Sequence, residues 1–126
     1  MRRSRRGPGV AIGIALHVLV AGLMLFAGSG KAFGFAPASV IQKMHTIGLG
    51  THIRLIGFGE LIAAILLLYP TTLSLGTLVT SGFWGGVICI HMAHGESLGL
   101  PIAMLLLTWI GAIFREPHTL ASFNRR

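Results

Sequence analysis

The chain has 126 residues, of which 53% are apolar and only 10% are charged. A soluble domain carries about 25% charged residues to hydrate its surface, so much of this protein must face lipid rather than water. The apolar composition excludes a disordered chain. The single cysteine, Cys89, excludes a disulfide scaffold, and without a resolving partner it does not predict a redox relay.

The net charge of +7 does not indicate nucleic-acid binding. No predicted helix carries a basic face, and no aromatic residues alternate with the charges as a nucleic-acid groove requires. Seven of the ten basic residues lie near the two ends of the chain, at Arg2, Arg3, Arg5, Arg6, Arg115, Arg125 and Arg126. We therefore expect no nucleic-acid partner and interpret the basic ends as determinants of membrane orientation.

Four apolar stretches predict membrane-spanning helices, over residues 9–29, 52–69, 72–93 and 98–114. Each approaches the roughly 17–25 residues that a helix needs to cross a bilayer. Helices are required because lipid cannot pair with open strand edges. The basic start followed by an apolar run resembles a signal peptide, but the run exceeds the usual apolar core of about 7–15 residues. We expect the first span to be retained.

The connections predict how the helices are arranged. Short turns at Pro70 and Gly95 force antiparallel neighbours, so we expect one all-α transmembrane domain over residues 1–126, an up-down-up-down four-helix bundle. The longer connection contains an apolar stripe of Val40, Ile41, Met44 and Ile47. This stripe predicts a short interfacial helix over about residues 38–48, with an ordered loop as the alternative.

An even number of spans places both termini on one side of the membrane. That side holds seven of the ten basic residues, whereas Lys31, Lys43 and Arg54 lie on the other. The excess predicts that both termini are cytoplasmic.

Several short motifs follow one another in a characteristic order. They are Gly28-Ser-Gly-Lys31, Arg54-Leu-Ile-Gly-Phe-Gly-Glu60-Leu, Leu-Leu-Leu-Tyr-Pro70, Ile90-His-Met-Ala-His94-Gly and Ile113-Phe-Arg-Glu-Pro117. In these motifs the chain resembles the DoxX-like family of small four-helix bacterial membrane proteins. The resemblance implies the bacterial inner membrane. It also implies a link to thiosulfate:quinone oxidoreductase subunits and to complexes that handle oxidative or thiol stress, although most members have no assigned activity.

A few ionisable residues interrupt the apolar stretches. Each costs roughly 2.5–3.5 kcal/mol to insert in a bilayer, so each needs a partner or a function. Glu60 lies roughly 9 Å below the Arg54 end of its helix at 1.5 Å per residue. Lys31, His91 and His94 fall near the same membrane depth, on the side opposite the termini. We expect a polar pocket there, roofed by residues 30–53.

This pocket predicts a binding site for a quinone or another apolar molecule with a polar head. The expected ligand-binding residues are Lys31, Glu60, His91, His94, Phe33 and Trp84. Lys31 and His91 would donate to a carbonyl, while Glu60 would accept a proton or fix the histidine tautomer. The protein would then be a subunit or accessory of a membrane redox system, with a redox partner or a second copy of itself.

Two other functions remain open from the sequence. In a membrane enzyme acting on a small apolar substrate, Glu60 and His91 would be the catalytic acid–base pair. In a structural or assembly protein without a ligand, Glu60 would pair with Lys31 or His91 only to fix helix register.

Metal and haem binding are weaker alternatives. His91 and His94 form an i, i+3 pair that could chelate a metal with Glu60, but no second acidic residue joins them, so we predict no metal site. Haem would need His17 or His91 as its axial ligand. His17 lies roughly 20 Å from the far end of its helix, and we expect a neutral histidine bonded to a carbonyl or hydroxyl.

Two small-x-x-x-small patterns predict close helix approach, at Gly9–Gly13 and Gly82–Gly86. We expect both to serve packing inside the bundle, with contact between subunits as the alternative.

Overall fold

The computed structural model describes residues 7–118, and every regular element in this range is helical. The four long helices are α1 (Pro8–Phe33), α3 (Ile53–Leu68), α4 (Leu73–Ala93) and α5 (Gly99–Arg115). A short helix, α2 (Ala38–Thr46), lies between α1 and α3, and single 3-10 turns at Gly50–His52 and Pro70–Thr72 precede α3 and α4. The prediction of an all-α protein with a short helix after the first long one is confirmed.

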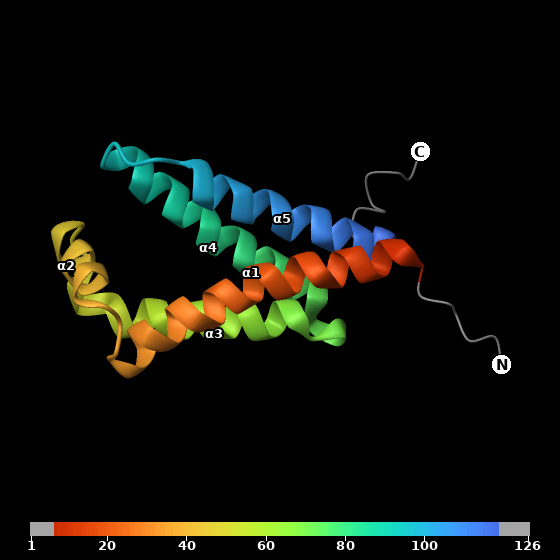
Figure 1. The fold of residues 1–126 in the computed structure, drawn as a ribbon, viewed down its shortest axis with the longest axis horizontal. Helices are drawn as coiled ribbons and strands as arrows, with labels where there is room; N and C mark the ends of the chain where they lie inside the picture. The colour runs from red at the N-terminus through yellow and green to blue at the C-terminus, as the bar shows by residue number, and fades with distance from the viewer. Residues whose placement is uncertain (1–6, 119–126) are drawn as a thin grey trace.

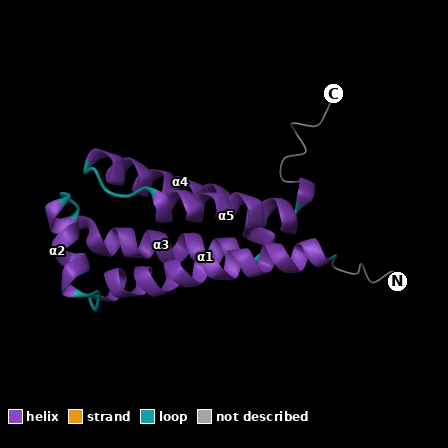
Figure 2. Ribbon diagram, turned by 45° about the horizontal axis from the view of Figure 1, so that its top comes forward, coloured by secondary structure: helices purple, strands orange, loops and turns teal. Residues whose placement is uncertain are grey.

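The long helices form an antiparallel bundle in which α1 and α4 each pack against both α3 and α5 (Figure 1). One end carries the start of α1, the end of α5 and the turn between α3 and α4. We call it the terminal end. The opposite end carries α2 and the 94–98 connection between α4 and α5, and we call it the α2 end (Figure 2).

The lengths of the helices suit a bilayer. Three helical stretches are long and apolar enough to span it, Pro8–Phe33, Gly50–Leu68 and Pro70–Ala93, while α5 has 17 residues. That length lies at the lower limit of roughly 17–25 residues for a span. Large apolar side chains cover the outward faces, such as Phe26, which is 82% exposed. These features are those of a multi-pass membrane protein.

The local sequence explains where α1 ends and which face of α2 is buried. The first helix runs past its predicted end at residue 29 to Phe33, because Gly34 is the residue that adopts the left-handed conformation (φ 82°) and ends it. In α2, Met44 of the apolar stripe is buried, whereas Gln42 and Lys43 are exposed. The amphipathic helix is therefore formed, and its apolar face turns toward the bundle.

Glycines determine where the helices touch. A Cβ atom added to Gly13 in α1 would lie 2.7 Å from the carbonyl oxygen of Gly111 in α5, and Gly76 in α4 packs directly on the α3 backbone. The Gly9–Gly13 pattern thus serves packing inside the bundle, as predicted. The same prediction is wrong for Gly82–Gly86, because an added Cβ atom at either position would meet nothing within 4 Å.

A cluster of the buried His17 and the half-buried Arg115 joins three helices near the terminal end. His17 Nε2 donates to the Thr108 carbonyl at 2.8 Å, and Arg115 Nη1 lies 2.9 Å from His17 Nδ1. Arg115 also donates to the carbonyl oxygens of Leu67 (2.7 Å) and Leu68 (3.2 Å). These carbonyls end α3 and lack partners within it. A guanidinium only donates, so His17 is neutral with its proton on Nε2, as expected.

Candidate functional site

A cavity of about 620 Å³ lies in the α2 half of the bundle. Residues of all five helices line it, and in this half the pair α1 and α3 diverges from the pair α4 and α5 (Figure 1). Its volume falls in the range of roughly 300–1,000 Å³ that is typical of small-molecule sites. The walls are mainly apolar, and the polar side chains that line it are those of Lys31, Lys43, Glu60, Trp84 and His91.

The deepest charges in the cavity form an ion pair. Lys31 Nζ donates to Glu60 Oε2 at 2.9 Å, and the Glu60 side chain is only 3% exposed. The two residues meet because Gly28 and Gly57 let α1 and α3 approach closely just beside them. The pairing leaves this part of the cavity polar but without net charge.

Trp84 supplies a buried hydrogen-bond donor that has no acceptor. The residue is 5% exposed and packs edge-to-face on Phe83, with ring centroids 5.2 Å apart. Its Nε1 has no hydrogen-bond partner within residues 7–118. Leaving such a group unsatisfied costs about 1–3 kcal/mol. The other tryptophan, Trp109, donates to Ser81 Oγ at 3.0 Å, so the orphaned donor is particular to the cavity.

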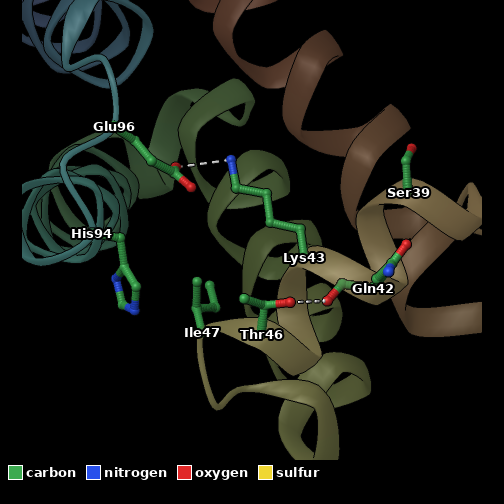
Figure 3. Close-up of a pocket in the computed structure, with 7 residues that line it drawn as sticks. All are labelled: Ser39, Gln42, Lys43, Thr46, Ile47, His94 and Glu96. Carbon is green, nitrogen blue, oxygen red and sulfur yellow. Dashed lines mark hydrogen bonds and ion pairs between the residues drawn. The ribbon is translucent and has the colours of Figure 1, made fainter.

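Three charged or ionisable side chains meet at the α2 end of the cavity. His91 Nδ1 donates to the Ser97 carbonyl at 2.8 Å, and its Nε2 lies 3.5 Å from Glu96 Oε2. The same Glu96 oxygen lies 2.9 Å from Lys43 Nζ, so an ion pair joins α2 to the 94–98 connection (Figure 3). The contact with Lys43 holds the pKa of the Glu96 carboxyl below its usual value, and nearby histidine charges act in the same direction.

Two residues predicted for the site lie outside the cavity. Phe33 is 62% exposed and packs on Phe35 and Phe58. It follows Lys31 by two positions, which places it on the opposite face of α1. His94 lines a separate, shallower hollow with Lys43 and residues of α2 (Figure 3). It lies one residue past the end of α4, where its Nδ1 contacts the Ile90 carbonyl at 2.9 Å.

The catalytic and metal alternatives use residues that already have partners. Glu60 and His91 line the same cavity, but Glu60 bonds to Lys31, whereas His91 bonds to the 94–98 connection. Within residues 7–118, no three His, Cys, Asp or Glu side chains are grouped so that they could hold a metal ion. Cys89 is exposed on α4.

Comparison with known proteins identifies the family. The model of the DoxX-like family matches residues 15–113, a range that begins in α1, ends in α5 and contains every polar residue of the cavity. No curated protein and no solved structure matches the chain.

Proposed function

Because this chain belongs to the DoxX-like family, we propose that it is a small subunit or accessory of a membrane redox system that holds a quinone-like molecule in its cavity. In this proposal it lies in the bacterial inner membrane with both termini cytoplasmic. The α2 end, with its cavity, then faces the outer side, and the electrons are exchanged with a redox partner.

The observation that carries this proposal is that Trp84 lines an apolar cavity and that its buried Nε1 has no partner within residues 7–118. A quinone head is flat and apolar but presents carbonyl acceptors, and its tail is lipid-soluble. When bound, it supplies two-electron redox chemistry. The orphaned indole N–H fits a carbonyl of this kind, because a buried donor without an acceptor is otherwise costly.

The ion pair of Lys31 with Glu60, which lines the same cavity as Trp84, defines which head group suits it. Lys31 uses one of its three donor hydrogens on Glu60 and keeps others for a ligand. Because Glu60 cancels its charge, the site favours a neutral head with acceptor oxygens over an anion. His91 lines the α2 end of the cavity, where its Nε2 lies 3.5 Å from Glu96 Oε2.

Extraction of the purified protein tests this function. We expect solvent extracts of protein isolated from bacterial membranes to contain quinone, identified by absorption and mass, in proportion to protein. Ala27→Phe fills the cavity wall and should abolish the association, whereas Ala15→Phe, on an exposed position of the same helix, should not. Equal quinone in both variants, or none in the unmodified protein, would contradict the proposal. Turnover of a substrate by the isolated chain would favour a membrane enzyme instead.

A structural role is the second candidate, and the direct Lys31–Glu60 pair favours it. Buried pairs can hold helix register without chemistry, and apolar replacements of both partners are often neutral or stabilising. The double variant Lys31→Met, Glu60→Met should therefore still fold. Under the proposed function it should lose bound quinone. Under a purely structural role every associated activity should persist.

A further inference from the structure

The contact between α3 and α4 is closed in one half of the bundle and open in the other. Toward the terminal end, Gly76 packs on the α3 backbone, and Thr80 Oγ1 donates to the Ala63 carbonyl at 3.4 Å. Beyond this point α4 presents Gly82 and Gly86. Since the two helices are antiparallel, residues after Thr80 in α4 lie opposite residues before Ala63 in α3.

Three glycines border the open part, Gly59 on α3 and Gly82 and Gly86 on α4. All three are exposed, all three line the cavity, and a Cβ atom added to any of them would meet nothing within 4 Å. The gap is therefore not filled by side chains of the bundle. It connects the cavity with the outward surface of these two helices.

The surface around this gap is apolar. One helical turn away, Ile62 on α3 is 56% exposed and Val79 on α4 is 37% exposed. At the α2 end, by contrast, the cavity is bordered by α2 and by the ion pair of Lys43 with Glu96. An apolar molecule dissolved in the bilayer thus meets an uncharged opening at the side of the bundle.

We propose that the opening bordered by Gly59, Gly82 and Gly86 is a lateral entrance, through which a lipid-soluble molecule bearing a hydrogen-bond acceptor passes from the bilayer into the cavity. Trp84 lines the same cavity as these glycines, and its buried Nε1 has no partner within residues 7–118, which indicates that the cavity receives such a molecule. The identity of that molecule as a quinone rests on the proposed function. The entrance itself rests on the glycines and Trp84.

Lipid access to Trp84 tests the entrance without any quinone. In a Trp109→Phe background, Trp84 is the only tryptophan. The test uses this variant reconstituted in two kinds of phosphatidylcholine vesicle, with and without bromine on the acyl chains. Bromine quenches tryptophan fluorescence on close contact. We expect brominated lipid to quench Trp84 although it is buried, and the pair Gly82→Leu, Gly86→Leu to restore most of the emission.

Gly85→Leu is the matched control, because Gly85 is equally open to an added Cβ atom but does not line the cavity. It should leave the quenching unchanged. Gly59→Leu closes the gap from α3 and should restore the Trp84 emission as the two α4 substitutions do. Because it leaves α4 unchanged, its effect cannot come from a local distortion of α4. The entrance is refuted if brominated lipid does not quench Trp84, or if these variants and Gly85→Leu behave alike. It is also refuted if crosslinking shows a second copy seated on the glycines.

Quinone association separates this inference from the proposed function. Decylubiquinone should quench Trp84 in unbrominated vesicles. The Gly82→Leu, Gly86→Leu pair should slow its association by about tenfold or more, because binding must then wait for a conformational change. Binding at an unchanged rate would overturn the entrance and leave the proposed function standing. If the glycine variants relieve quenching by lipid but no quinone binds, the result would support the entrance and overturn the proposed binding of quinone.

Discussion

Toward the terminal end, Gly13 and Gly76 bring helix backbones into contact, whereas from the middle of α4 onward Gly82 and Gly86 leave a gap. The buried polar groups differ in the same way. His17 at the terminal end is bonded on both ring nitrogens, while the Trp84 N–H at the α2 end has no partner within residues 7–118. In the α2 half, α1 and α3 still pack closely through Gly28 and Gly57, so the cavity arises where α4 separates from α3 and not from loose packing of every helix.

Two single replacements of an α4 glycine by leucine, at Gly76 and at Gly82, should give the largest difference in unfolding free energy. Gly76→Leu forces α4 off the α3 backbone and should lower the free energy of unfolding by about 3 kcal/mol or more. Gly82→Leu meets no neighbouring atom and should leave it nearly unchanged. Unfolding in mixed micelles, followed by circular dichroism, measures both. Equal losses would show that packing does not differ between the two ends.

Replacing an arginine by methionine at each end should give the next largest difference. Arg115→Met removes the donor to His17 and to the carbonyls that end α3. It should cost about 2–3 kcal/mol of unfolding free energy, since buried acceptors lose their partner. Arg54→Met changes an exposed side chain at the α2 end and should have little effect. The same unfolding assay compares them, and an unaffected Arg115→Met would contradict a stabilising cluster.

The two tryptophans should respond differently to phenylalanine. Trp109→Phe removes the hydrogen bond to Ser81 and should destabilise the protein by about 1 kcal/mol. Trp84→Phe removes a donor that has no acceptor within residues 7–118, so in detergent without ligand it should cost only the packing lost from the buried ring. A Trp84 indole N–H proton resonance shifted as far downfield as that of Trp109 would mean that its N–H is already satisfied.

The smallest effect should be the pH dependence of the ion pair at the α2 end. The pKa of Glu96 is held below its usual value of 4.5 by Lys43. The contribution of this contact is therefore fully present above pH 4.5 and is lost as the pH falls through the lower folded-state pKa.

Spin labels on Ser39 and Ala93, in a Cys89→Ser background, measure this loss. We expect a narrow distance distribution at neutral pH that broadens only in acid, and a broad one at every pH for Glu96→Gln. A distribution that is independent of both pH and Glu96 would show that the ion pair does not hold α2.

Hydropathy and connection length were sufficient to predict the fold, because a span must be apolar for about twenty residues and short turns force antiparallel neighbours. Helix rise then predicted that Lys31, Glu60 and His91 lie at one depth, and all three line the cavity. These quantities depend on spacing along the chain, so they can be obtained without knowledge of the side-chain packing.

The remaining features depend on side-chain packing, which a sequence pattern does not specify. Gly9–Gly13 and Gly82–Gly86 share one spacing, yet only the first meets another helix. The two tryptophans are alike in sequence, yet only Trp109 has an acceptor in reach. His94 was assigned to the site by its membrane depth, but it lies past the end of α4 and lines a separate hollow.

Titration of quinone into the two single-tryptophan variants tests the central claim most directly. In vesicles of unbrominated lipid, decylubiquinone should quench Trp84 of the Trp109→Phe variant saturably, at one quinone per chain. It should quench Trp109 of the Trp84→Phe variant more weakly, because that ring lies outside the cavity lining. Equal, linear and non-saturating quenching of both tryptophans would mean that the quinone is only dissolved in the bilayer and that the cavity does not bind it.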